Sequence, residues 1–500
     1  MMRFLVRREA KVIIVLFFIF LRVFSSEVYA AVKQDILGGG THFRYVDDFN
    51  SVEQAMASCL SFAASIGEVN AYCYPTYDDA TNRGMIAAGY LFDKSSSTFY
   101  FVMFYFGKCS APEIFNVSTA SCGIDEQKGM PSPESCAGNP INLAVGNKFQ
   151  AETDYNSGST GSFAFARAYN SNDGVWRHNY STSIRFAEGK LSVIHNDGRE
   201  SFFTVSGEVA VAYPNETGTL VKVNNSWLYS SVDNQQYLFD SQGRLTRWTD
   251  KDGLTQQLIY ENGSVTVSHV SGKSFTFTED AQHQPISFTT SDTKIAYHYD
   301  NNKHLTQLIR TRGLQTERRQ FHYEDARNTG LLTGITDERG IRFATWAYDD
   351  KGRAISSQHN GGAALTQVSY NADGSSTVTN ELGKTTVYQY QQIGGIKRVT
   401  SIQGEPSANC PASNSTYTYN NRGLVLTKTD AKGLITTYEY NDRGLEVSRT
   451  EASGTTLART TTTEWDPDRF LPIRVIEPNR VTVYSYDNQG RVLTRQSTSR

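Results

Sequence analysis

The sequence predicts a mainly β protein in which a small disulfide-bearing α+β domain precedes a tandem array of β-hairpin repeats. Aromatic residues make up 12% of the 500 residues, chiefly as 28 Tyr and 27 Phe. Such side chains suit the half-buried surface of a pleated sheet, and the 39 Gly supply turns between strands. One aromatic-led motif returns through the second half of the chain, and its eleven steps from Phe239 to Tyr486 average about 22 residues.

The N-terminus has the features of a secretory signal peptide. Basic residues stand at positions 3, 7, 8 and 11, an apolar run follows over 12–21, and the small residue Ala30 closes the segment. The run is too short to span a bilayer, which needs about 20 apolar residues. Residues 1–30 are therefore predicted to be removed by cleavage after Ala30, with an uncleaved anchor as the alternative. The protein is then expected to be secreted or held at the cell surface.

Residues 31–136 are predicted to form the small α+β domain. Ser51 can cap a helix whose apolar positions recur at helical spacing over 52–63. Two strands follow at 84–92 and 97–106, around a polar turn. The second strand is apolar on both faces, which is typical of a central strand.

Five of the six cysteines fall within this domain. Clustered cysteines in an exported segment commonly pair as disulfides, whereas metal binding calls for closely spaced pairs such as C-x-x-C. Disulfides are therefore predicted, with metal binding as the less favoured alternative, and the connectivity stays open because five is an odd number. The disulfide candidates are Cys59, Cys73, Cys109, Cys122 and Cys136.

Residues 137–235 are predicted as an antiparallel β segment that leads into the array. A polar Gly138-Asn139-Pro140 opens it, and strand-like alternation follows over 147–155, 163–169 and 180–186. Asp-Gly pairs at 173–174 and 197–198 suit tight hairpin turns, because Gly readily takes a positive φ.

Residues 236–500 carry the repeat. Its clearest copies read aromatic-Asp-x-x-Gly-Arg and begin at positions 239, 348 and 486, and variants with Asn begin at 370, 419 and 440. Weaker copies begin at Tyr260, Phe277, Tyr299, Tyr323, Tyr390 and Trp465. The predicted turn residues are Phe239, Asp240, Gly243, Tyr348, Asp349, Gly352, Tyr419, Gly423, Tyr440, Gly444, Tyr486, Asp487 and Gly490.

Each repeat unit is predicted to be one hairpin. The aromatic ends a strand, the Asp or Asn side chain accepts a backbone N–H in the turn, and Gly takes the position where a Cβ would be strained. The aromatic ring is expected to stack on the equivalent ring of the next hairpin. An isolated hairpin is marginal in water, so the units must join into one continuous sheet.

These Tyr-Asp-x-x-Gly-Arg units resemble the YD repeats of bacterial RHS proteins, which animal teneurins share. The stretch from Gly138-Asn139-Pro140 through Gly146-Asn147-Lys148 is similar to the segment that commonly precedes such repeats. This chain departs from the usual pattern in having Ile after Pro140 and Val before Gly146. The resemblance covers about residues 138–500. It implies that the repeats spiral into a hollow β shell around a variable C-terminal polypeptide, often a toxin.

The family closes its shell with a Pro-rich segment that carries an Asp-Pro-x-Gly type of cleavage signature. Asp466-Pro467 is followed here by Asp468-Arg469 and lies within the repeat phase. The chain is therefore expected to hold the wall of a shell without its closing segment or its cargo.

No motif in the sequence predicts catalysis. The nine His are scattered singly, and HExxH, C-x-x-C, GxSxG and Walker patterns are absent from the sequence. A formal net charge of −3 offers no basic stripe for nucleic acid. The sequence thus predicts a non-enzymatic protein with no cofactor and no metal site.

The leading hypothesis is an exported RHS-repeat shell or scaffold from a polymorphic-toxin, contact-dependent competition system. It would encapsulate or present a C-terminal effector that this chain lacks, so its partners would be that effector or the remainder of the shell. The alternative is a cell-surface adhesin or glycan-binding repeat protein, with glycans as partners. The coding sequence beyond residue 500 distinguishes the two.

Overall fold

The computed structural model describes residues 127–158, 163–187, 189–404 and 414–500, together with the backbone of seven strands between residues 33 and 123. The chain divides into two compact units, Met1–Cys109 and Ser110–Arg500. Nearly all the regular structure in the described residues is β, which confirms the predicted mainly β class.

The described part of the first unit is a mixed five-stranded sheet in the order β1-β2-β5-β4-β3. β2 and β5 are parallel, and the other neighbouring pairs are antiparallel. The two strands predicted at 84–92 and 97–106 correspond to β4 and β5, and β5 is the central strand as predicted. The helix predicted over 52–63 lies outside the described residues, as does the predicted signal peptide. The strand bounds are β1 Lys33–Leu37, β2 Gly40–Phe49, β3 Tyr72–Asp78, β4 Arg83–Leu91 and β5 Phe99–Lys108.

The second unit begins with short elements and a three-stranded sheet. β6 pairs with β7, β8 pairs with β9, and the third small sheet has the order β10-β11-β12. Residues 127–158 and 163–182, which we call the inner segment, contain η1 and β8 to β12. The bounds are β6 Ile114–Asn116, β7 Ser121–Gly123, η1 Pro133–Ser135, β8 Cys136–Ala137, β9 Ile141–Asn142, β10 Phe149–Asn156, β11 Ala164–Asn170 and β12 Trp176–His178.

One antiparallel sheet of 30 strands, β13 to β42, makes up the rest of the second unit, and its spatial order follows the sequence throughout. It begins well before the first clear repeat. Of the strands predicted at 147–155, 163–169 and 180–186, only the last, which corresponds to β13, is part of this sheet, whereas the first two correspond to β10 and β11 of the small three-stranded sheet. The strands of its first half are β13 Ser183–Ala187, β14 Lys190–Ile194, β15 Glu200–Ser206, β16 Val209–Ala212, β17 Thr219–Val223, β18 Ser226–Ser230, β19 Gln236–Phe239, β20 Leu245–Thr249, β21 Thr255–Glu261, β22 Ser264–His269, β23 Ser274–Glu279, β24 Pro285–Thr289, β25 Thr293–Tyr299, β26 Leu305–Arg312 and β27 Gln315–His322.

The second half of the sheet carries the later repeats and a short 3-10 turn, η2 Asn360–Gly362. Its strands are β28 Gly334–Thr336, β29 Arg342–Tyr348, β30 Ala354–His359, β31 Thr366–Tyr370, β32 Ser376–Thr379, β33 Thr385–Ile393, β34 Ile396–Gly404, β35 Ser415–Tyr419, β36 Val425–Thr429, β37 Ile435–Tyr440, β38 Glu446–Glu451, β39 Arg459–Trp465, β40 Pro472–Glu477, β41 Arg480–Tyr486 and β42 Val492–Ser499.

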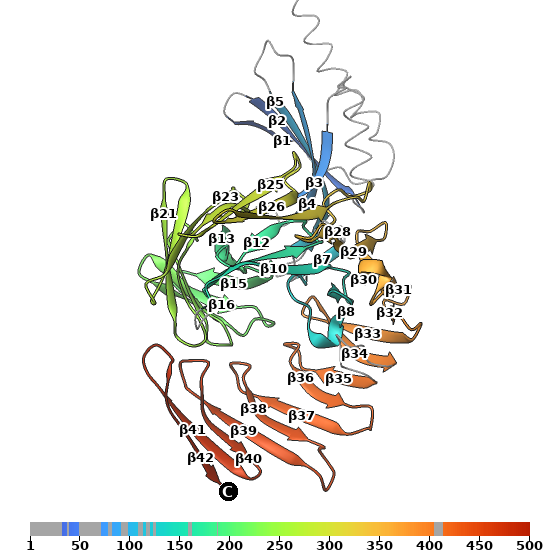
Figure 1. Cartoon of the computed structure of the whole chain (residues 1–500). Helices are drawn as coiled ribbons and strands as arrows, with labels where there is room; N and C mark the ends of the chain where they lie inside the picture. Colours follow the sequence, from blue (N-terminus) through green and yellow to red (C-terminus); the bar gives the residue numbers. More distant parts are fainter. Residues whose placement is uncertain are drawn as a thin grey trace, which may run out of the picture. The chain divides into compact units, whose positions relative to one another are not determined.

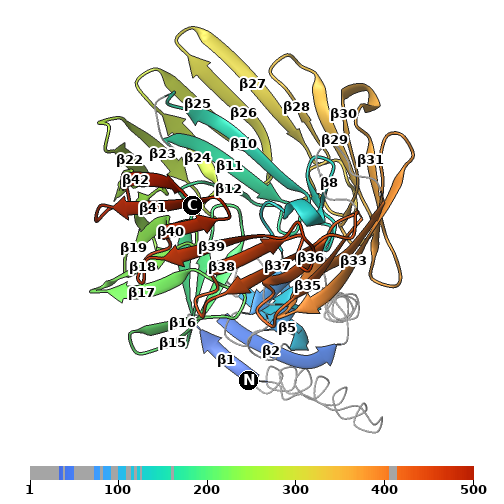
Figure 2. The same ribbon diagram turned by 90° about the horizontal axis from the view of Figure 1, so that it is seen from below.

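The long sheet curves around the inner segment. Figures 1 and 2 show β10 to β12 within the curve, and they show the last strands passing beside the first strands of the same sheet. Arg422, in the turn between β35 and β36, donates from Nε to the Pro214 carbonyl at 3.1 Å. Arg491 packs so closely over Gly253 that a Cβ at Gly253 would lie 2.5 Å from the Arg491 Cγ. The sheet therefore winds as a spiral that contacts its own earlier strands.

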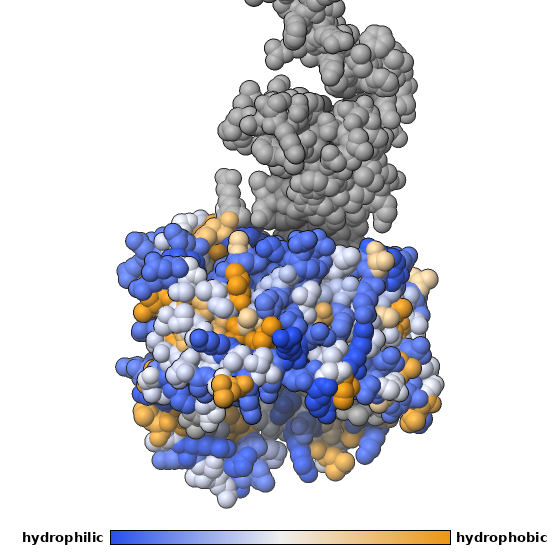
Figure 3. Space-filling view, turned by 45° about the horizontal axis from the view of Figure 1, so that its top comes forward, coloured by the Kyte–Doolittle hydropathy of each residue, from blue (hydrophilic) through white to orange (hydrophobic). Residues whose placement is uncertain are grey.

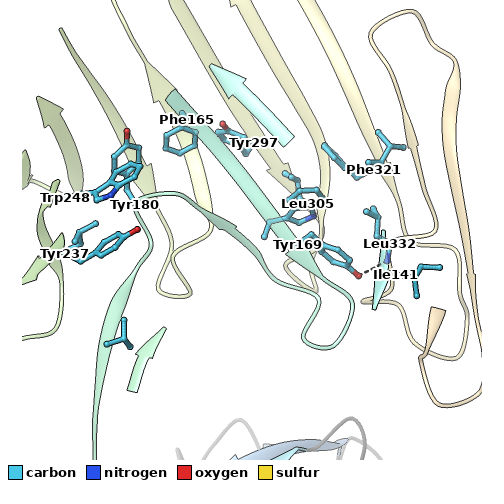
Figure 4. Packing of buried hydrophobic residues seen from close by; sticks show 14 of the residues in the cluster. Ile141, Phe165, Tyr169, Tyr180, Tyr237, Trp248, Tyr297, Leu305, Phe321 and Leu332 are labelled. Carbon is cyan, nitrogen blue, oxygen red and sulfur yellow. Dashed lines mark hydrogen bonds between the residues drawn. The ribbon is translucent and has the colours of Figure 1, made fainter. Parts of the chain in front are cut away.

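Alternation along strands such as β22 separates an apolar inner face from a polar outer face. On β22, Val265 and Val267 are buried, while Thr266 points outward and lies 3.2 Å from the Thr276 hydroxyl across the sheet. Side chains on a strand point to opposite faces with a period of two, so the sequence alternation fixes which face is buried. The buried side chains of the inner face and of the inner segment form one hydrophobic cluster, part of which is drawn in Figure 4. On the visible surface, hydrophobic groups lie in small separate patches (Figure 3).

Candidate functional site

The candidate site is the interface between the inner segment and the inner face of the long sheet. Phe165, on β11, packs among Phe277, Phe288 and Tyr297 with tilted rings at centroid distances of 5.3, 5.0 and 6.4 Å. Burial of aromatic rings contributes the largest apolar areas of any side chains, so this packing is the main apolar attachment of the inner segment. The inner segment therefore fills part of the space inside the curved sheet.

Two aromatic side chains also make polar contacts across the interface. The Tyr169 hydroxyl donates to the Gly330 carbonyl at 2.7 Å and accepts from the Leu332 N–H at 2.8 Å (Figure 4). The Trp176 indole Nε1 donates to the Tyr323 hydroxyl at 2.9 Å. Burial raises the pKa of Tyr169 well above its ordinary value, so this hydroxyl stays neutral and able to donate.

A buried ion pair lies at the centre of the interface. Arg167 Nη2 donates to Asp154 Oδ1 at 2.9 Å, and Arg167 Nε donates to Asp154 Oδ2. The two side chains are only 0% and 3% exposed. The Tyr297 hydroxyl donates to the same Asp154 carboxylate at 2.8 Å. Burial alone lowers the pKa of Arg167, but Asp154 outweighs it and raises this pKa above its ordinary value.

The Arg167 guanidinium is also enclosed by rings. It lies 4.5 Å from the Trp176 ring centroid and 5.2 Å from that of Phe321. A cation over an aromatic face is attracted by the ring, and the attraction grows when water is excluded. The pair thus joins β10 and β11 of the inner segment to β25 and β27 of the sheet.

The buried face of β10 is a row of polar side chains. Lys148 Nζ donates to the Phe149 carbonyl and to Gln150 Oε1 at 2.9 Å, and Gln150 Nε2 donates to Glu152 Oε1 at 2.8 Å. Glu152 in turn accepts from Arg319 Nη1 on β27. Burial lowers the pKa of Lys148 well below its ordinary value, although Glu152 opposes this shift.

The first residues of the inner segment are fixed to later strands. The Asn139 N–H donates to Ser357 Oγ at 3.0 Å, and the Trp346 indole donates to the Asn139 carbonyl at 3.2 Å. The Ser376 hydroxyl donates to the Leu143 carbonyl at 2.7 Å. The segment from Gly138 to Lys148 is therefore attached to β29, β30 and β32, which follow it by about 200 residues or more.

A histidine from β12 completes the interface. His178 Nε2 lies 2.8 Å from Glu279 Oε2 on β23, and His283 Nδ1 lies 2.9 Å from the other oxygen of the same carboxylate. Burial lowers the pKa of His178, whereas the hydrogen bond to Glu279 raises the pKa of His283. The carboxylate lies between the two rings, so the arrangement holds the chain rather than opening a site for a ligand.

The turns of the repeats share one geometry, seen clearly at Asp487. Its Oδ1 accepts the N–H groups of Gln489 and Arg491 at 2.9 Å each, and the Gly490 N–H donates to the Asp487 carbonyl at 3.1 Å. This is a type I turn followed by a residue in the left-handed region, which suits glycine. The glycines at the clearest copies have positive φ: Gly243 (81°), Gly352 (75°), Gly423 (74°), Gly444 (82°) and Gly490 (83°). Asp240, Asp349, Asn420 and Asn441 start equivalent turns.

The expectation that repeat aromatics stack on one another was wrong. Among the described ring pairs, none joins two of the twelve phased aromatics. Equivalent residues are two strands apart, which is about 9–10 Å and too far for ring contact. Seven of the tyrosines instead donate from their hydroxyl to a carbonyl of the preceding hairpin: Tyr260 to Leu245, Tyr299 to Pro285, Tyr348 to Leu332, Tyr370 to Ala354, Tyr419 to Val399, Tyr440 to Val425 and Tyr486 to Pro472.

Arginines link successive turns in the last repeats. Arg422 Nη1 donates to the Asp442 carbonyl at 2.9 Å, Arg443 Nη1 to the Asp466 carbonyl at 2.7 Å, and Arg469 Nη1 to the Asp487 carbonyl at 2.7 Å. The repeats are thus joined at their turns as well as along their strands.

The remaining predicted site residues are the cysteines. Cys136 is buried and assigned to a disulfide whose partner lies outside the described residues. The side chains of Cys59, Cys73, Cys109 and Cys122 also lie outside them, so the disulfide pattern of the N-terminal domain stays a prediction.

The described residues contain no group of His, Cys, Asp and Glu that could hold a metal ion. In the same part of the chain, no helix is long and apolar enough to span a bilayer.

Sequence reasoning missed the inner segment's polar residues, although a signal for them existed. Phe163, just before β11, and Phe165, Arg167 and Tyr169 on β11 are alternate residues that are all buried, so an arginine interrupts an otherwise aromatic row. Charged residues are rarely buried unless paired, and such an interruption indicates a buried ion pair.

Two family models match the chain. One, described as a domain of unknown function (DUF6531), covers residues 138–203, which include most of the inner segment. The other, described as RHS Repeat, covers residues 413–456, where the turns at Asn420 and Asn441 lie. Residues 413–456 therefore match the RHS repeat family, in line with the resemblance of the YD units. No curated protein matches it in sequence.

Solved structures are similar to parts of this chain at low TM-scores. The crystal structure of TcdB2-TccC3-TEV is 11% identical with a TM-score of 0.36, covering 89% of this chain and 30% of that one. The crystal structure of TcdB2-TccC3-Cdc42 is 12% identical with a TM-score of 0.29, covering 68% and 20%. This chain thus spans less than a third of either structure. At these TM-scores the likeness carries no further conclusion.

Proposed function

We propose that the chain is an exported, non-enzymatic RHS-repeat scaffold that encloses or presents a C-terminal effector polypeptide. The observation that carries the proposal is the attachment of the inner segment to the inner face of the long sheet. That attachment uses buried rings and the hydrogen bond from the Tyr297 hydroxyl to Asp154, so the curvature of the wall is fixed by the chain itself. A wall held open in this way provides an interior in which another polypeptide can be kept.

Export, cleavage after Ala30 and disulfides in residues 31–136 are part of the same proposal. The basic and apolar pattern of residues 1–30 and the clustered cysteines support them. A toxin held inside an exported wall would suit contact-dependent competition between cells, with the effector as the principal partner.

The experiment is to express the full natural coding sequence, including any part beyond codon 500, and to treat the product with protease. Enclosure predicts that a downstream polypeptide is resistant while the wall is folded and is degraded when the wall is unfolded by urea. A downstream polypeptide that is cleaved at once from the folded protein would contradict the proposal. A coding sequence that stops at codon 500, with a product that binds cells or glycans, would favour the adhesin.

A further inference from the structure

The inner face of the long sheet changes in character along the spiral. From β22 to β29 the inner positions are mainly buried and apolar, as Val267, Phe277, Leu308 and Trp346 illustrate, and the inner segment covers them. From β35 onward the cross-strand rows of the same face carry mainly Tyr, Thr, Lys and Arg, with Glu451 and Val475 among them. Most of these side chains are at least partly exposed.

Three cross-strand neighbours on this later stretch pair a tyrosine with a cation. Tyr417 lies opposite Lys428, whose Nζ is 5.6 Å from the ring centroid. Tyr484 lies opposite Arg495, whose guanidinium carbon is 5.8 Å from the ring centroid. Tyr438 lies opposite Arg449. We call this stretch, β35 to β42 on the inner face, the polar lining.

The charges of the polar lining are incompletely matched. Arg449 Nε lies 3.9 Å from carboxylate oxygens of Glu446 and Glu451, yet it makes no hydrogen bond. Among the described residues, no ion pair joins Lys428 or Arg495 to a carboxylate. The tyrosine faces hold these cations in place without neutralising them.

On the part of the inner face that the inner segment covers, the groups that bind inward-pointing arginines can be identified. Arg319, on β27, points inward and is bound by Glu152 of the inner segment. Arg310, on β26, donates from Nε to the Asp154 carbonyl of the inner segment at 3.2 Å. Where a segment lies against this wall, it therefore brings carboxylate and carbonyl oxygens to the inward arginines.

We propose that the polar lining binds a carboxylate-bearing polypeptide segment, with Lys428 and Arg495 as the residues that select for negative charge. This inference rests on the proposed function, because it names the chemistry by which the interior receives its effector. The bound segment is polar and acidic rather than apolar, since the lining offers cations and tyrosine faces in place of a hydrophobic surface.

The test uses the full chain and three fluorescein-labelled 20-residue peptides: one rich in Glu, Tyr and Ser, one with Lys replacing Glu, and one with Gln replacing Glu. Fluorescence anisotropy gives the Kd of each. The proposal expects the acidic peptide to bind tighter than both others. Exposed ion pairs contribute about 0.2–1 kcal/mol each, so the double variant Lys428→Gln and Arg495→Gln should weaken acidic binding by about two- to thirtyfold.

A matched control is Lys294→Gln, because Lys294 lies on β25 with its exposed side chain on the outer face. The control should bind the acidic peptide as the unchanged protein does, and circular dichroism should show all variants folded. Equal binding of the three peptides, no binding, or an effect of the control as large as that of the double variant would overturn the proposal. Loss of enclosure in the protease experiment would instead count against the proposed function, whatever the peptides do.

Discussion

The indole of Trp176 donates a hydrogen bond of 2.9 Å to the hydroxyl of Tyr323, although the two residues are 147 positions apart in the chain. Trp176 belongs to the inner segment, and Tyr323 is one of the phased aromatics of the repeat array. Tyr323 therefore belongs to a repeat motif and also makes a contact with a residue far away in the sequence. The inner segment and the wall are therefore expected to unfold together.

This contact can be measured by a double-mutant cycle. Tyr323→Phe removes the acceptor and leaves the buried indole N–H unpaired, which should cost about 1–3 kcal/mol in the free energy of unfolding. Combining it with Trp176→Phe should reveal a coupling energy of about 1 kcal/mol from urea denaturation. Tyr260→Phe is the control, because its hydroxyl bonds to the Leu245 carbonyl. Additive effects of the first two substitutions would argue against the contact.

The buried ion pair makes a stronger prediction. Asp154→Ala leaves Arg167 charged, enclosed and unpaired, so the free energy of unfolding should fall by about 3–5 kcal/mol. Replacing both residues with apolar ones, Asp154→Leu and Arg167→Met, should recover much of that loss. Glu208→Ala, at an exposed position, should change little. A single substitution at Asp154 that proved neutral would show that the pair is not buried.

Substitutions at Gly433 and Gly444 can distinguish the cost of backbone strain from the cost of side-chain crowding at the turns. Gly433 and Gly444 have φ of 79° and 82°, but only at Gly444 would a Cβ meet another group, the Arg422 guanidinium at 2.9 Å. Gly433→Val should cost about 1–2 kcal/mol through strain alone, and Gly444→Val should cost more. Thermal unfolding gives the comparison. Equal midpoints for both variants and the unchanged protein would contradict the turn geometry.

Acid should weaken the second unit through His195, which is buried beside Ser201 at 2.8 Å. Burial, helped by Arg199, lowers the pKa of His195 from 6.5 to about 4. Between these two values the unfolded chain therefore binds more protons than the folded protein. The stability that the neutral His195 allows is fully present above pH 6.5, and the free energy of unfolding falls by roughly 3 kcal/mol as the pH falls toward 4. His195→Gln should flatten this part of the stability profile. An unchanged slope would remove His195 as its cause.

Local features of the array could be predicted from the sequence because they depend on few neighbouring residues. The turn at Asp487–Arg491 is set by one carboxylate, one glycine and the backbone between them. The role of the repeat tyrosines could not be read in this way. Tyr440 reaches the Val425 carbonyl of the preceding hairpin, and only the spacing of strands decides between that contact and ring stacking.

The docking of the inner segment was beyond sequence reasoning for a different reason. Tyr169 meets Gly330 and Leu332, and Asn139 meets Ser357, across separations of 161 to 218 residues. Alternation indicates that a face is buried, but it does not say which distant face covers it. The interrupted apolar row at Arg167 marked a buried charge without naming Asp154 as its partner.

Hydrogen exchange followed by mass spectrometry tests the central claim, that the inner segment is docked inside the repeat wall. Peptides covering β11 and β12 should be protected to the same degree as peptides covering β25 to β29, and both should lose protection together as urea is raised. Rapid exchange of β11 and β12 while β25 to β29 remain protected would contradict the account.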